Sequence, residues 1–119
     1  MTKKELFELF VDYFEEHMPE AKTELNYSNG FELLVAVILS AQCTDKRVNQ
    51  VTPALFKAFP LPELMALSSQ EEIFHYIRSV SYPNNKSRHL FRMANMLIKD
   101  FNSKVPMTVD ELQLLPGVG

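Results

Sequence analysis

Seven consecutive apolar residues, Leu33–Leu39, constrain the fold of this 119-residue chain more than any other feature. A surface element would alternate apolar and polar residues, so this run predicts a segment that is buried on every side. Periodicity alone does not distinguish a buried helix from a buried strand. Asn29 and Glu32 have the spacing of a helix cap, and the segment from Phe31 to Ala41 has the length of a helix. We therefore predict a central helix there.

Helix caps recur along the rest of the chain. Thr2–Glu5, Ser68–Glu71 and Thr108–Glu111 each pair a hydroxyl residue with a glutamate three positions later, which is the pattern of a capping box. Apolar residues follow each box at helical spacing. These signals predict an all-α fold, a compact helical bundle of about seven helices joined by short connections.

Proline positions refine the predicted helix boundaries. Pro53 lies inside the apolar pattern that starts at Asp45, and we expect it to kink or break that helix. Pro62 suits the first position of a short helix that ends near Leu67. After a loop over residues 81–85, a long helix is predicted, with one apolar face made of Leu90, Ala94, Leu97, Ile98 and Phe101.

Composition excludes several classes of protein. The chain is 46% hydrophobic, enough for a packed core, and no apolar run approaches the roughly 20 residues of a membrane span. The acidic N-terminal region differs from a secretion signal, so we expect a cytoplasmic protein with no membrane partner. The single cysteine, Cys43, excludes an internal disulfide and any metal site of several thiolates built from this chain alone. We predict that it is a small buried residue rather than a reactive thiol.

Charge is distributed unevenly along the sequence. The net charge of −3 argues against a nucleic-acid partner when taken alone. Residues 1–40 carry eight acidic and three basic side chains, whereas residues 41–119 carry seven acidic and nine basic ones. Most of the local positive charge lies at Lys46–Arg47 and between Lys86 and Arg92. Solvated helix faces are the simpler explanation, and a nucleic-acid surface is the alternative.

The last five residues are Leu115-Pro116-Gly117-Val118-Gly119. Such a turn after an apolar helical segment is either a plain helix cap or the hairpin of a helix-hairpin-helix element. Gly117 and Gly119 permit positive φ angles, and the exposed N–H groups of such a turn bind phosphate oxygens. In the second interpretation the bundle ends in a truncated helix-hairpin-helix, and the chain is a fragment of a longer protein.

Two polar loops are further candidates for a binding site. Gln42, Thr44 and Asp45 follow the central helix, and they either cap the next helix or line the mouth of a cleft. Tyr82 lies on a loop that is stiffened by Pro83 and flanked by basic residues. This second loop is either an ordinary connection or an aromatic wedge for a stack of bases.

Taken together, these features resemble the endonuclease III family of DNA glycosylases. The segment from Phe31 to Asp45, FELLVAVILSAQCTD, carries the strongest likeness. Asn84, Lys86 and then Val105-Pro106, leading to the terminal turn, fall in the family's order and spacing. The resemblance covers the whole chain, and the related adenine glycosylases carry a different sequence at Ser40–Asp45.

The resemblance implies roles for individual residues. Gln42 resembles the residue that fills the gap left by a flipped nucleotide, and Tyr82 occupies the position of an apolar wedge, usually leucine. At Ser81–Pro83 the family more often has a glycine, an aliphatic residue and an aromatic one. Thr44 and Asp45 are expected in the base pocket. The residues expected to bind DNA are Gln42, Val80, Tyr82, Asn84, Lys86, Gly117, Val118 and Gly119.

The function implied by the resemblance is base excision repair. Family members remove oxidised pyrimidines from double-stranded DNA and cleave abasic sites by β-elimination. The family's catalytic lysine and aspartate, and the four cysteines of a [4Fe-4S] cluster, are expected beyond Gly119. We therefore expect this chain to hold no catalytic residue, metal or cofactor and to be inactive alone. The alternatives are a non-catalytic helix-hairpin-helix module, an adenine-glycosylase-like relative, and a helical interaction domain without nucleic acid.

The resemblance also predicts a division of the chain near residue 28. Residues 1–27 are expected to form a helix and a connection that pack on the C-terminal part of the parent protein. Residues 28–119 are expected to form most of the glycosylase domain up to the hairpin. Without its usual cover the first helix would expose apolar side chains, so self-association is expected through Leu6, Phe10, Tyr13 and Phe14.

Overall fold

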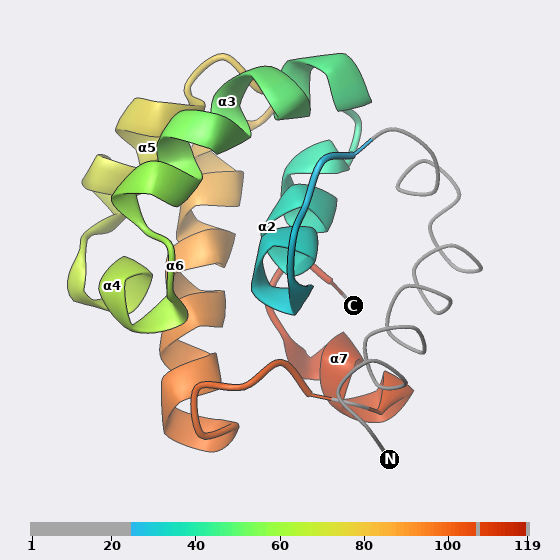
Figure 1. The fold of residues 1–119 in the computed structure, drawn as a ribbon, viewed down its shortest axis with the longest axis vertical. Helices are drawn as coiled ribbons and strands as arrows, with labels where there is room; N and C mark the ends of the chain where they lie inside the picture. Colours follow the sequence, from blue (N-terminus) through green and yellow to red (C-terminus); the bar gives the residue numbers. More distant parts are fainter. Residues whose placement is uncertain (1–24, 107, 119) are drawn as a thin grey trace.

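The computed structural model describes residues 25–106 and 108–118, and within them it contains six helices and no strand (Figure 1). This confirms the predicted all-α bundle. The predicted first helix, from Thr2 to about His17, and the self-association attributed to it lie outside the described residues. The helices are α2 (Gly30–Ser40), α3 (Asp45–Ala58), α4 (Pro62–Leu67), α5 (Gln70–Ile77), α6 (Pro83–Asp100) and α7 (Val109–Leu114).

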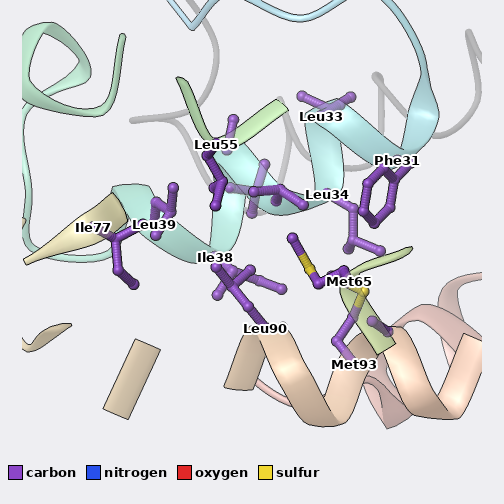
Figure 2. Close-up of a cluster of buried hydrophobic side chains, with 14 of the residues drawn as sticks. Phe31, Leu33, Leu34, Ile38, Leu39, Leu55, Met65, Ile77, Leu90 and Met93 are labelled. Atoms are coloured by element: carbon purple, nitrogen blue, oxygen red, sulfur yellow. The ribbon is translucent and has the colours of Figure 1, made fainter. Parts of the chain in front are cut away.

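The central helix predicted from the apolar run is α2. The Asn29 side chain accepts a hydrogen bond from the Glu32 backbone N–H, and the Glu32 carboxylate accepts two from Ser28, each at 2.9 Å. Every residue of Leu33–Leu39 is at most 2% exposed. α3 and α6 pack against α2, and Figure 2 shows its side chains facing those of Met65, Leu90 and Met93. The prediction of a central helix is confirmed.

α6 is the second main contributor to the core. α4 and α5 pack against it, and Leu90, Met93, Ala94 and Leu97 on its inner face are fully buried. Ile98 was predicted to share this face but is 37% exposed. One residue advances an α-helix by about 100°, so Ile98 turns away from the core that Leu97 enters.

In the described part of the chain, no helix combines the length and the apolar character that crossing a membrane requires.

Pro53 does not break α3, so the predicted break was wrong. The helix is continuous from Asp45 to Ala58 with Pro53 inside it. Pro53 is exposed, on the side of α3 opposite its buried face of Val48, Val51, Thr52 and Leu55. Proline removes one backbone hydrogen bond, and water can replace that bond on an exposed face, while the packed face keeps the helix intact.

Ser69, rather than Ser68, caps α5. Its hydroxyl oxygen accepts a hydrogen bond from the Glu72 backbone N–H at 3.1 Å. The predicted box at Ser68 was wrong by one residue because the Ser68 hydroxyl donates to the Met65 carbonyl at 2.6 Å and closes α4. Two adjacent serines therefore serve two helices, one ending and one beginning.

The terminal turn packs onto the core. The predicted Thr108 cap of α7 is confirmed, because its hydroxyl oxygen accepts from the Glu111 N–H at 3.2 Å. Val118 donates from its backbone N–H to the Leu115 carbonyl at 3.1 Å, and both side chains are buried. Gly117 has φ +84°, and a Cβ there would lie 3.1 Å from Ile38 Cγ2. Only glycine fits this approach of the turn to α2 without strain.

Candidate nucleic-acid interface

Gln42 and Tyr82, in two loops of the bundle, have left-handed backbone conformations, as do Asn102 and Ser103 after α6. Gln42, between α2 and α3, has φ +54°, and Tyr82, at the N-cap of α6, has φ +51° and ψ +52°. Both side chains are exposed, Tyr82 by 60%. A non-glycine residue in this region costs about 1–3 kcal/mol, and such strain concentrates at functional sites. These two residues are therefore candidates for function on structural grounds as well.

A cavity of about 700 Å³ lies between the two loops and the terminal turn. It brings together segments that are distant in the sequence: the end of α2, the start of α6 and the hairpin glycine. The lining residues are Ile38, Ala41, Gln42, Tyr82, Asn85, Lys86, His89 and Gly117. Four of the residues expected to bind DNA, Gln42, Tyr82, Lys86 and Gly117, thus line a single cavity.

Lys86 forms the inner wall of the cavity and points into the protein. It is 4% exposed, and its Nζ donates hydrogen bonds to the Leu39 carbonyl at 2.8 Å, the Ala41 carbonyl at 2.6 Å and the Ser81 hydroxyl at 3.0 Å. Burial lowers the pKa of this amine, and the neighbouring Cys43 opposes that effect by raising it. All three ammonium protons are committed to the chain's own oxygens, so Lys86 stabilises the loops rather than presenting a free charge.

Thr44 and Asp45 lie at the start of α3 and do not line this cavity. The Thr44 hydroxyl oxygen accepts from the Arg47 backbone N–H at 3.1 Å, so Thr44 caps the helix, as one of the two interpretations held. Asp45 is half-buried in the first turn, where its negative charge interacts favourably with the helix N-terminus. Cys43, predicted to be buried, is half-buried against the core.

The remaining expected DNA-binding residues occupy different environments. Val80 and Val118 are 4% and 2% exposed and belong to the core. Asn84 is exposed, and its backbone carbonyl accepts hydrogen bonds from Gln70 and Ser87. Gly119 lies outside the described residues. Val80 and Val118 thus support the loop and the hairpin from beneath.

Asn85 and His89 line the cavity although sequence analysis did not assign them to the site. Their positions relative to Tyr82 are three and seven residues further along α6. This spacing places all three on one helix face. Helical spacing from Tyr82 was thus the signal that would have identified them.

The burial of His89 and the positive charges beside it make the stability of the protein depend on pH. Burial lowers the pKa of His89 from its ordinary value, and the positive side chains of Arg88 and Arg92 lower it further. The folded protein therefore favours the neutral imidazole, while the unfolded chain protonates near the ordinary value of about 6.5. The stability that this difference contributes is present above that pH and is lost as the pH falls below it.

We expect His89→Asn to reduce the loss of stability on acidification. The wild-type free energy of unfolding should fall more between pH 7.5 and pH 5 than that of the variant, because the variant has no imidazole to protonate there. Urea unfolding at both pH values measures this difference. His75→Asn, the same change at an exposed position, is the control. An equal pH dependence of wild type and His89→Asn would contradict the prediction.

Comparison with known proteins identifies the family of this site. The HhH-GPD superfamily of base excision DNA repair proteins matches residues 35–117 of the 119. The chain belongs to the HhH-GPD superfamily. The range that matches this superfamily includes Gln42, Tyr82 and Gly117, and therefore both loops and the turn that surround the cavity.

Individual HhH-GPD relatives are similar over the whole chain or most of it. Endonuclease III of Bacillus subtilis (strain 168) is 41% identical over 119 residues, which are 100% of this chain and 54% of that protein. Endonuclease III of Synechocystis sp. is 42% identical over 100 residues, 84% of this chain and 46% of that protein. The chain thus spans about half the length of these relatives.

Solved structures agree with this assignment. A trapped endonuclease III–DNA covalent intermediate and a non-covalent endonuclease III–DNA complex each match with a TM-score of 0.79 and 42% identity. Each match covers 100% of this chain and 55% of the solved one. A thermostable thymine-DNA glycosylase matches with a TM-score of 0.66 at 20% identity, which shows a shared fold.

Proposed function

We propose that the protein is a bifunctional DNA glycosylase that removes oxidised pyrimidines from double-stranded DNA and cleaves the abasic site by β-elimination. In this proposal the present chain supplies the loops that enter the DNA and the turn that binds a phosphate. The observation that carries it is the cavity that Gln42, Tyr82 and Gly117 share. The endonuclease III relatives and their DNA complexes support the choice of substrate.

The chemistry of such an enzyme needs a nucleotide turned out of the base stack. A lysine amine then attacks C1′, the base leaves, and the resulting Schiff base permits β-elimination of the 3′ phosphate. Unstacking costs a few kcal/mol, which side chains recover in part by filling the gap. Gln42 and Tyr82 are exposed at the cavity and suit that role.

The residues described here do not fit the [4Fe-4S] cluster that the family implies for the longer protein. A cluster of this type takes four cysteine thiolates, and Cys43 is the chain's only cysteine. Residues 25–106 and 108–118 contain no group of three or more histidine, cysteine, aspartate or glutamate side chains able to hold a metal. None of the proposed steps involves such a cluster.

A second candidate function is that of a non-catalytic DNA-binding module. The hydrogen bonds that hold the Lys86 amine favour it. Lys86 is the one amine among the residues that line the cavity, and its Nζ is buried and hydrogen-bonded to three oxygens of the chain itself, so it is not presented to a substrate. The lysine nucleophile of the first candidate must therefore come from outside the cavity described here.

Binding and trapping experiments with the 119-residue chain test both candidates. We expect the chain to bind a duplex with a tetrahydrofuran abasic analogue about tenfold more tightly than the undamaged duplex, because the gap is already open. Equal affinity for the two duplexes would contradict DNA recognition by this cavity.

Borohydride reduction with natural abasic DNA should give no covalent adduct of this chain. A trapped adduct would place a nucleophilic amine within residues 1–119 and overturn that expectation.

A further inference from the structure

Ser81 and Lys86 connect the two loops that carry Gln42 and Tyr82. The Ser81 hydroxyl donates to the Gln42 carbonyl at 2.8 Å and accepts from Lys86 Nζ at 3.0 Å. Lys86 reaches back 45 residues or more along the sequence to the carbonyls of Leu39 and Ala41. One chain of hydrogen bonds thus runs from the end of α2 to the residue that precedes Tyr82.

The end of α2 explains why a cation lies there. The last carbonyls of a helix lack partners within the helix and carry partial negative charge. A buried ammonium satisfies two carbonyls in this region, at Leu39 and Ala41, and hydrogen bonds from a charged donor are stronger than those between neutral groups. With Lys86 only 4% exposed, water does not compete for these contacts.

The Ser81 hydroxyl is the point at which the two loops meet. It bonds to the carbonyl of Gln42 itself, and it belongs to the residue next to Tyr82. Gln42 and Tyr82 both have left-handed backbones, which relax unless their surroundings hold them. A serine at this position thus fixes one strained loop against the other.

We propose that Ser81 and Lys86 are positioning residues that hold the Gln42 and Tyr82 loops as one rigid unit, so that both side chains enter damaged DNA together. The inference rests on the proposed function of the cavity. A rigid unit binds with a smaller loss of conformational entropy than two independent loops. The effect should therefore appear on damaged DNA, where the side chains insert, more than on intact duplex.

Ser81→Ala tests this positioning role with little change in side-chain volume. We expect affinity for the tetrahydrofuran duplex to fall about tenfold, the scale of a hydrogen bond that involves a charged group. Affinity for undamaged duplex should change less than about twofold, and the salt dependence should stay the same because no phosphate contact is lost. Ser81→Thr keeps the hydroxyl and should restore binding.

Ser79→Ala is the matched control for Ser81→Ala. Ser79 lies on the same loop, is exposed, and has no hydrogen bond of its side chain to the described residues.

A double-mutant cycle separates positioning from general destabilisation. In the Tyr82→Ala background, Ser81→Ala should cost clearly less than its tenfold loss in the wild-type background, because one of the two side chains that it positions is gone. A cost as large as in the wild-type background would overturn the positioning role.

Amide hydrogen exchange in the free protein provides a readout that does not depend on DNA. Ser81→Ala should speed exchange at Cys43 and Val80, whose N–H groups bond within the two loops, and leave Phe59 at the end of α3 unchanged. Unchanged exchange at both loops would overturn the link between them. A wild-type chain without preference for the abasic analogue would overturn the proposed function and the positioning role together. A normal wild-type preference that persists in Ser81→Ala would overturn the positioning role alone.

Discussion

Tyr82→Ala is expected to bind the abasic-analogue duplex about 1–3 kcal/mol more weakly than wild type, the scale of one base–aromatic stack. This corresponds to a loss of about five- to 150-fold in affinity. Tyr82 is 60% exposed, next to a cavity, and fixed by a left-handed backbone and by Pro83. Its truncation is therefore expected to remove the proposed contact with DNA and little of the packing inside the protein.

Three comparisons make the Tyr82 experiment specific. Tyr82→Phe retains the ring and should bind nearly as well as wild type. Gln42→Ala should lose less affinity than Tyr82→Ala, because an amide recovers less stacking than a ring. The salt slope should be the same for all of them, since no phosphate contact changes. Wild-type affinity in Tyr82→Ala would mean that Tyr82 is only a loop aromatic beside Pro83.

Local sequence signals were sufficient for most of the described helices and for two of their caps. The Asn29 and Thr108 caps and the buried run of α2 form as predicted, because each depends on residues within a few positions of one another. Ser68 and Ser69 show the limit of such signals. Either serine suits a cap, and Ser69 caps α5 because the Ser68 hydroxyl bonds to the Met65 carbonyl at the end of α4.

Contacts between distant segments determined what sequence analysis did not foresee. The hydrogen bonds of Lys86 to the carbonyls of Leu39 and Ala41, 47 and 45 residues away at the end of α2, were not foreseen from its place beside a polar loop. Pro53 was expected to kink or break α3, and the helix continues through it without a break. The cavity itself unites α2, α6 and the terminal turn. The spacing of residues within one segment does not show which distant segments will line the same cavity.

The site shows the same contrast between what local sequence predicts and what contacts between distant segments determine. Gln42, Tyr82 and Gly117 were singled out from their loops and turn, family resemblance gave them roles, and the structure adds that they share one cavity. Asn85 and His89 also line the cavity, and helical spacing from Tyr82 places them on one face, but their nearness to the turn at Gly117 comes from the fold. The identity of the exposed residues was thus accessible from sequence, whereas the internal supports were not.

Leu34→Ala is expected to lower the free energy of unfolding by about 2–5 kcal/mol, the largest effect of any stability change considered for this chain. Leu34 is fully buried near the middle of α2, and Figure 2 shows it in the cluster that includes Met65 and Met93. Alanine would leave a cavity that α4 and α6 cannot fill without moving. Urea unfolding followed by circular dichroism gives the difference directly.

Leu67→Ala is the matched control for Leu34→Ala. Leu67 is 82% exposed at the end of α4, so the same chemical change there should alter the free energy of unfolding by no more than about 0.5 kcal/mol. The difference between the two variants then measures burial at α2 rather than the helix propensity of alanine. Similar losses in both would contradict the central position of α2. That position also fixes where α2 presents Gln42, so Leu34→Ala should reduce DNA binding only under conditions in which it unfolds the chain.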